Sequence, residues 1–282
     1  MTNPPVPEFV DSTDGVRVRI HDLGGDGPPL ILSHATGFCG GVWRPFAAAL
    51  ADRHHCFAID YRAHGESQLP AGVTLEWGGM AADLLAVIDA VSPDEPVRVM
   101  GHSLGGAAIV LAGVQAPGRI AAAAAFEPIL IPLDAPSRRS PLVDGARKRR
   151  AVWPSRAEAR ERYGSRPPLS LLDADALDAY VEFGFVDLPD GTVTLRCEPE
   201  HEAQVFEHHK SGAWEAAGDI DFPYLVAVGA GDELPAVAGR RVAEAFPDRF
   251  ALADYPDLTH FGPLEAPARV AADVDAWFRS IS

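Results

Sequence analysis

The feature that most constrains the fold is an alternation of short apolar runs with stretches of helical periodicity. Continuous apolar runs occupy residues 29–34 (PLILSH), 55–61 (HCFAIDY) and 97–102 (VRVMGH). Runs of this length suit strands that are buried on both faces. Residues 75–91 and 104–116 carry apolar residues at helical spacing. The alternation predicts an α/β protein with a mostly parallel sheet covered by helices on both faces.

The same pattern continues on both sides of this region. Residues 16–24 alternate and are typical of a strand in an early hairpin. The alanine-rich run 120–126 is predicted to be a strand because it lies between a helix and Pro128. Two further strands are expected near the C-terminus, at 223–229 and 249–255, followed by a closing helix at 264–281.

The alternation of predicted strands and helices is interrupted between Pro132 and about Asp221. A Ser155–Glu158 capping-box pattern predicts one helix there. The sequences LDADALDAYVEFG and EPEHEAQVFEHH predict two more. We therefore expect a core formed by residues 1–131 and 222–282, interrupted by a mainly helical lid formed by residues 132–221.

Composition excludes several classes of function. The formal net charge of -16 over 282 residues disfavours nucleic acid as a partner. No segment is apolar for long enough to span a membrane, and the first residues lack the features of a secretory signal. Three widely spaced cysteines, Cys39, Cys56 and Cys197, indicate a reducing compartment and no metal knuckle. We expect a cytoplasmic protein that needs no cofactor and no metal; its oligomeric state is left open.

Residues 101–106 (GHSLGG) place a serine between a predicted strand and a predicted helix. The pattern G-x-S-x-G in this context is typical of a sharp turn that exposes a nucleophilic serine. Glycines on both sides prevent clashes with neighbouring elements. Ser103 is therefore the candidate nucleophile, and the Leu104 amide at the helix N-terminus is a candidate oxyanion donor.

A serine needs a base, and the base needs a carboxylate. His260 is the candidate base because it lies between the last predicted strand and the last helix. Asp232 is the preferred acid because it follows a predicted strand end and gives the chain order Ser, Asp, His. Glu127 is the alternative acid, since it also follows a strand end and is costly to bury unless paired. Glu233 is a third, weaker choice.

The second oxyanion donor is expected from the loop HATGFCGG that follows residues 29–34, with the Thr36 amide as the candidate. At this point the chain resembles α/β-hydrolase fold enzymes over nearly its whole length. The matching motifs are SHATGF, DYRAHGES, GHSLGG, GAGD and THFGPLE. Ala35 and Ala63 stand where the family usually has glycine. The resemblance implies an eight-stranded sheet and a serine hydrolase, and some relatives take their acid from the position of Glu127.

The lid carries further candidates. Substrate contacts are considered for Glu127 and for four aromatic residues of the insertion: Trp153, Phe183, Phe206 and Trp214. Residues 134–166 hold ten of the 24 Lys and Arg residues but only four acidic residues. This basic segment is interpreted as docking on an acidic body. Alternatively, one or two residues among Arg147, Lys148, Arg149 and Arg150 meet an anionic part of the substrate.

The sequence thus predicts hydrolysis of a small-molecule carboxylic ester or lactone through an acyl-enzyme. Two alternatives stay open. A carbon–carbon bond hydrolase or a cofactor-free perhydrolase would use the same triad. A small-molecule receptor on the same scaffold would keep the triad and turn over slowly.

Overall fold

The structure is a computed structural model that describes residues 6–136 and 140–281. Its centre is an eight-stranded sheet with the order β1-β2-β4-β3-β5-β6-β10-β11. The pairs β1–β2 and β2–β4 are antiparallel and the other pairs are parallel, so the predicted sheet is confirmed. The strands are β1 (Phe9–Asp11), β2 (Arg17–Asp22), β3 (Pro29–Ser33), β4 (His55–Asp60), β5 (Val97–His102), β6 (Ile120–Phe126), β10 (Tyr224–Val228) and β11 (Phe250–Asp254).

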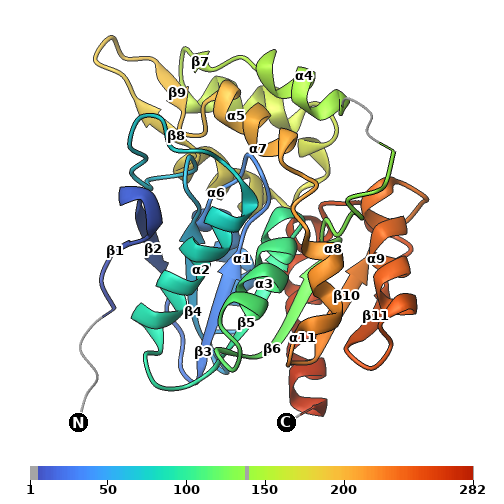
Figure 1. The fold of residues 1–282 in the computed structure, drawn as a ribbon. Helices are drawn as coiled ribbons and strands as arrows, with labels where there is room; N and C mark the ends of the chain where they lie inside the picture. The colour runs from blue at the N-terminus through green and yellow to red at the C-terminus, as the bar shows by residue number, and fades with distance from the viewer. Residues whose placement is uncertain (1–5, 137–139, 282) are drawn as a thin grey trace.

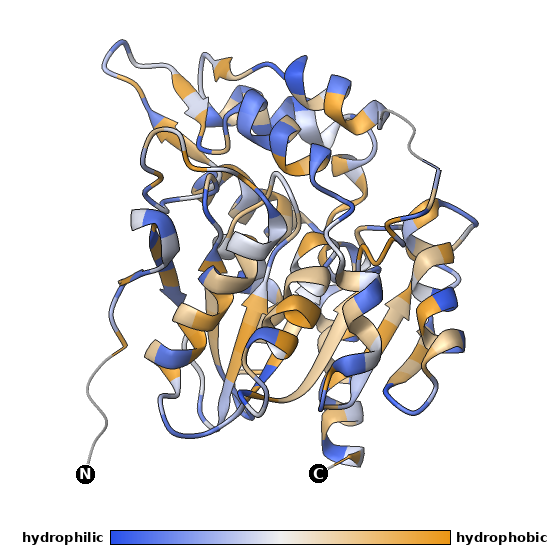
Figure 2. Cartoon of the chain, viewed as in Figure 1, coloured by the Kyte–Doolittle hydropathy of each residue, from blue (hydrophilic) through white to orange (hydrophobic). Residues whose placement is uncertain are grey.

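Helices cover both faces of this sheet (Figure 1). Side chains alternate along each central strand, so that Ile31 enters one core cluster while Leu30 and Leu32 enter the other. The first cluster is closed by α2 (Trp77–Val91), α3 (Leu104–Gln115), α8 (Ala213–Ala216) and α9 (Leu234–Ala245). The second is closed by α1 (Arg44–Ala48) and α11 (Pro267–Ser280). Figure 2 shows the apolar residues concentrated on these strands and on the helix faces toward them.

Most of the segment between β6 and β10 forms a layer above one end of the sheet, whereas its last helix, α8, lies beside α3 on one face (Figure 1). As expected, Ser155 caps α5 by accepting a hydrogen bond from the Glu158 amide. The insertion also contains a three-stranded antiparallel sheet of order β7-β9-β8, which the sequence pattern did not predict. Its elements are α4 (Pro141–Arg147), β7 (Val152–Trp153), α5 (Arg156–Gly164), α6 (Ala174–Phe183), β8 (Phe185–Asp187), β9 (Val193–Leu195), α7 (Pro199–Glu207) and α8.

Two other differences concern the C-terminal part. The predicted closing helix is divided into α10 (Gly262–Glu265) and α11, because Ala266 before Pro267 has φ −136° and ψ 61°. Helix α9 was not predicted: its buried face consists largely of small residues such as Ala236, Gly239 and Ala243, which weaken the helical pattern of hydrophobicity. Within the described residues, no helix combines the length and the apolar character needed to cross a membrane.

Candidate active site

Ser103 occupies a strained turn between β5 and α3. Its backbone has φ 55° and ψ −114°, a conformation that non-glycine residues rarely adopt. A Cβ atom on Gly101 would lie 2.8 Å from the Gly106 amide nitrogen, and one on Gly105 would lie 2.3 Å from the Ser33 carbonyl oxygen. Both flanking glycines are therefore required by close backbone contacts. Strain of this kind persists where the surrounding structure fixes it, and it is common at reactive residues.

His260 lies on the loop after β11 and binds Glu127. Its Nδ1 lies 2.6 Å from Glu127 Oε2. Since a carboxylate oxygen accepts, Nδ1 donates, and the neutral ring keeps Nε2 free as a base. The other oxygen, Glu127 Oε1, accepts a hydrogen bond of 2.8 Å from the Gly229 amide. Glu127 is only 2% exposed, so its two oxygens meet their partners in a nearly water-free position.

This geometry corrects the preferred acid. Asp232 is exposed in the loop between β10 and α9 and makes no hydrogen bond or ion pair with any described residue. Strands β6 and β10 are neighbours, so both of their C-terminal loops reach the same sheet edge. Chain order alone ranked Asp232 first. Glu127 has a positive φ of 44° and contacts His260 through its carboxylate, and no sequence pattern reveals either feature.

Ser103 and Glu127 both lie next to Phe126, the last residue of β6, and the segment that follows His260 packs on the Phe126 ring. The Ser103 amide donates to the Phe126 carbonyl at 3.0 Å, and Glu127 is the next residue along the chain. Gly262 approaches the Phe126 ring so closely that a Cβ atom would lie 2.3 Å from it. Ser103 is 8% exposed, and its Oγ makes no hydrogen bond with a described residue. Catalytic hydrogen bonds to a serine often tighten only when substrate is bound.

The two predicted oxyanion donors come from adjoining segments. Thr36 follows β3, Leu104 begins α3, and Gly105 contacts Ser33 at the end of β3. Neither the Thr36 amide nor the Leu104 amide donates a hydrogen bond to a described residue. Two free amides beside a strained serine can stabilise an oxyanion.

Two buried histidines hold the loop that carries Thr36. His34 Nδ1 donates to the Ala35 carbonyl at 2.7 Å, and His34 Nε2 accepts from the Tyr61 amide at 3.1 Å. His64 Nδ1 donates to the Arg62 carbonyl at 2.9 Å, and His64 Nε2 accepts from the Gly37 amide at 3.0 Å. Burial lowers the pKa of His34 to about 4 and that of His64 to about 3. Both rings are therefore neutral near pH 7, as these bonds require.

Two aromatic rings lie next to that of His260, those of His102 at 4.9 Å and Phe261 at 5.4 Å. His102 Nε2 donates to the His260 carbonyl at 2.8 Å, and burial lowers the pKa of His102 well below its usual value. The Phe38 ring lies 5.0 Å from that of Tyr180 and 5.9 Å from that of Phe261. Sequence reasoning missed Phe38 and Phe261 as site residues. Their signal was their position, since Phe38 ends the motif SHATGF and Phe261 lies within the motif THFGPLE.

The four aromatic residues proposed as pocket residues lie elsewhere. Trp153 packs on Tyr163, and Arg150 stacks over its ring. Phe183 packs against Gly41, Phe206 joins a small cluster between α4 and α7, and Trp214 packs on Phe246. None of the four has a described ring contact with His102 or His260. Their apolar character is used in packing of the insertion and the core.

The basic segment finds its partners within the insertion. Arg147 binds Glu200, Arg149 binds Glu202 and Arg150 binds Glu158. Lys148 is exposed and has no ion-pair partner among the described residues. Arg138 and Arg139 lie outside the described residues. The acidic partner of these three arginines is thus the lid itself, and not the body of the protein as expected.

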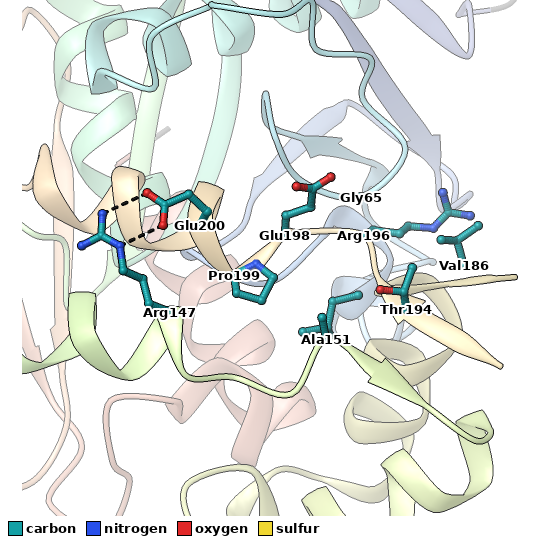
Figure 3. A pocket seen from close by; sticks show the side chains of 10 residues that line it. Gly65, Arg147, Ala151, Val186, Thr194, Arg196, Glu198, Pro199 and Glu200 are labelled. Carbon is teal, nitrogen blue, oxygen red and sulfur yellow. Dashed lines mark hydrogen bonds and ion pairs between the residues drawn. The ribbon is translucent and has the colours of Figure 1, made fainter.

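Two cavities open on the insertion, and neither contains Ser103 or His260. One of about 580 Å³ lies between Gly65 and the lid residues around Arg147, Arg196 and Glu200 (Figure 3). The other, of about 770 Å³, is lined by residues of the segment 149–169. Among the described residues, no group of three or more His, Cys, Asp and Glu side chains is arranged to hold a metal ion.

Comparison with known proteins identifies the family of this chain and several proteins that are similar to it. A model of the Alpha/beta hydrolase family matches residues 30–273. Over 121 residues the chain is 35% identical to protein phosphatase methylesterase 1 of Rattus norvegicus, a match covering 38% of this chain and 31% of that relative. The chain thus spans about a third of the length of that relative.

Solved structures resemble the whole chain. E-2-(acetamidomethylene)succinate hydrolase superposes with a TM-score of 0.80 at 20% identity, covering 96% of this chain and 99% of that one. Esterase RhEst1 from Rhodococcus sp. ECU1013 superposes with a TM-score of 0.76 at 22% identity, covering 99% of this chain and 100% of that one. At these identities the likeness concerns the fold alone.

Proposed function

The chain belongs to the alpha/beta hydrolase family, and from that premise we propose that it is a serine hydrolase that cleaves a carboxylic ester or lactone. The observation that carries the proposal is the strained Ser103, which directly follows His102 in the chain. The ring of His102 lies 4.9 Å from that of His260, whose Nδ1 is held by the buried carboxylate of Glu127. The methylesterase and esterase names of similar proteins support ester cleavage.

The proposed reaction has two halves. Ser103 Oγ attacks the ester carbonyl while His260 Nε2 takes the serine proton, and the Thr36 and Leu104 amides hold the oxyanion. The tetrahedral intermediate expels the alkoxide, which leaves as alcohol with the proton from His260. Water then attacks the acyl-enzyme, His260 takes a proton from it, and Ser103 is released with that proton. Glu127 keeps the imidazole in the required tautomer and stabilises the imidazolium.

The aromatic rings of Phe38, Tyr180 and Phe261 indicate which kind of substrate to expect. Phe261 contacts the rings of both His102 and His260. Phe38 contacts that of His102, and Tyr180 packs on Phe38, which gives an apolar aromatic surface on one side of the histidine pair. Such a surface favours an apolar group of the substrate next to the scissile bond. We infer that esters with short apolar acyl groups are the first substrates to assay.

The test combines labelling with turnover. We expect a fluorophosphonate to label the protein at Ser103 with a stoichiometry of about one, and p-nitrophenyl acetate to be hydrolysed over many turnovers. Ser103→Ala is expected to lose both activities while keeping its melting temperature, because the change removes one oxygen from the structure. Adduct formation at the active site of Ser103→Ala contradicts the assignment. Labelling of the parent protein without turnover of any ester favours the receptor alternative.

A further inference from the structure

A buried ion pair lies in the lid. Arg149 follows α4, and Glu202 lies on α7. Arg149 Nη1 donates to Glu202 Oε2 at 2.5 Å, and Arg149 Nη2 donates to the Tyr180 hydroxyl at 2.6 Å. Glu202 is 6% exposed. Buried ion pairs contribute little more to stability than apolar side chains of the same size, so stability alone gives no reason for this one.

The pair packs directly on the loop after β3 that carries Thr36, here called the oxyanion loop. A Cβ atom on Gly37 would lie 2.5 Å from Glu202 Oε1 and 3.3 Å from Arg149 Nη1. Gly37 has φ +79° and directly follows Thr36. Its amide is held by His64 Nε2, so the residue is fixed by His64 through its N–H and by Glu202 at its Cα.

The same network reaches the next residue of the loop. Tyr180, which accepts the hydrogen bond from Arg149, lies with its ring 5.0 Å from that of Phe38. Arg149 therefore holds Glu202, which lies against Gly37, and Tyr180, which lies against Phe38. The peptide that presents the Thr36 amide is bounded by this network on its C-terminal side.

A second ion pair joins the same two lid segments without touching the loop. Arg147 Nε and Nη2 donate to the two carboxylate oxygens of Glu200 at 2.8 Å and 2.9 Å (Figure 3). Each partner stands two residues before its counterpart in the buried pair. The side chain of Glu200 is 53% exposed, whereas that of Glu202 is 9% exposed. Arg147 also pairs with Glu207 at 3.0 Å, so loss of Arg147 removes the exposed ion pairs between α4 and α7, and loss of Glu200 removes one of them. These exposed pairs separate the effect of linking α4 to α7 from the effect of contacting Gly37.

We propose that Glu202, held by Arg149, is a positioning residue that fixes Gly37 and so keeps the Thr36 amide aimed at the oxyanion. This inference rests on the proposed function. Glu202 acts through the loop and does not touch the reacting atoms. The lid then completes the oxyanion site in addition to covering it.

The test uses four single variants in matched pairs. Glu202→Ala and Arg149→Met are compared with Glu200→Ala and Arg147→Met, using p-nitrophenyl acetate and the concentration of fluorophosphonate-reactive sites. We expect kcat to fall roughly ten- to hundredfold in the first pair, somewhat less than the loss of a whole oxyanion donor. KM should change by less than about threefold, because the lost interaction acts on the transition state. The second pair should keep kcat within about twofold.

A further readout distinguishes positioning from lid stability. A trifluoromethyl ketone forms an oxyanion on Ser103, so its inhibition constant should rise in parallel with the loss of kcat in Glu202→Ala. Glu202→Gln keeps the volume and an acceptor for Arg149, and it should restore most of the activity. The double variant Arg149→Met/Glu202→Ala leaves no unpaired charge and should lose about as much kcat as either single variant, since the two residues act as a unit.

Two results overturn the inference alone. One is equal kcat per reactive site in Glu202→Ala and Glu200→Ala. The other is a fall in kcat with no change in trifluoromethyl ketone affinity. Failure of the parent protein to react with fluorophosphonate and with all esters instead overturns the proposed function, and the inference falls with it.

Discussion

At the scale of the residue, Glu127 shows how tertiary contacts hold a buried carboxylate in an unfavourable backbone conformation. Its φ of +44° is unfavourable for a residue with a Cβ atom. The conformation is held because both carboxylate oxygens are used, one by His260 and one by the Gly229 amide. Burial strengthens both bonds, since little water competes with them. The proposed triad is therefore Ser103, His260 and Glu127.

Substitution of the two candidate acids tests this assignment. Glu127→Gln is expected to lower kcat by roughly 10³–10⁴, because the amide no longer fixes the tautomer of His260. Asp232→Asn is expected to leave kcat within about twofold, as for an exposed side chain without partners. Steady-state hydrolysis of p-nitrophenyl acetate gives both values, and circular dichroism verifies folding. The opposite ranking would return the acid to Asp232.

At the scale of the element, the parts with strong periodicity were predictable and the parts set by tertiary contacts were not. The central strands and the helices α2 and α3 carry long apolar patterns. The sharp turn that carries Ser103, here called the elbow, is marked by the motif GHSLGG. Helix α9 and the strands of the lid are short or built on small residues, so their patterns are weak. The choice of Glu127 over Asp232 depends on the contacts of the Glu127 carboxylate with His260 and the Gly229 amide, which are tertiary. The packing of Arg149 and Glu202 on Gly37 joins segments more than a hundred residues apart, which no local pattern encodes.

Alanine substitution is expected to have opposite effects on stability at two helical glycines. A Cβ atom on Gly78, in the first turn of α2, meets nothing within 4 Å, whereas one on Gly105, in the first turn of α3, lies 2.3 Å from the Ser33 carbonyl oxygen. Gly78→Ala is expected to raise the free energy of unfolding by about 0.5–1 kcal/mol, because alanine is the better helix former. Gly105→Ala is expected to lower it and to reduce kcat, since either β3 or the elbow must shift.

Urea denaturation of both variants, with ester hydrolysis measured beside it, gives the comparison. Gly78→Ala serves as the control for the general effect of adding a methyl group at the start of a helix. Equal stability and activity of the two variants would show that the elbow tolerates a side chain at Gly105.

At the scale of the whole molecule, most of the lid lies above one end of the central sheet (Figure 1). Basic residues of the first half of the lid pair with acidic residues of its second half, as in Arg147–Glu200 and Arg149–Glu202. The lid is thus held partly by its own charges, although the chain has a net charge of -16. Beneath it, uncharged histidines support the oxyanion loop, and this ties global stability to pH.

The free energy of unfolding is expected to fall as pH decreases below about 6.5. The unfolded chain then protonates His34 and His64, whereas the folded protein does not until about pH 4 for His34 and about pH 3 for His64. Each histidine contributes a slope of about 1.4 kcal/mol per pH unit within its window, and none above it. Urea denaturation between pH 7.5 and pH 4 measures the slope.

His64→Gln provides the matched test of this origin. Glutamine cannot titrate, so the slope of stability against pH should decrease by about one proton between pH 6.5 and pH 4, whatever the change in absolute stability. An unchanged slope in this variant would assign the acid sensitivity to other groups.

The loop between β10 and α9, which contains the exposed Asp232, is a suitable site for attaching a label. Residues 230–234 are all exposed, and the contact that matters to the triad is made by the amide of Gly229, just before them. Surface segments of this kind accept inserted sequence well. A short peptide tag or a fluorophore attached after Asp232 is expected to leave hydrolysis intact. The protein can thus be tethered to a support or tracked in single-molecule experiments by a label in this loop.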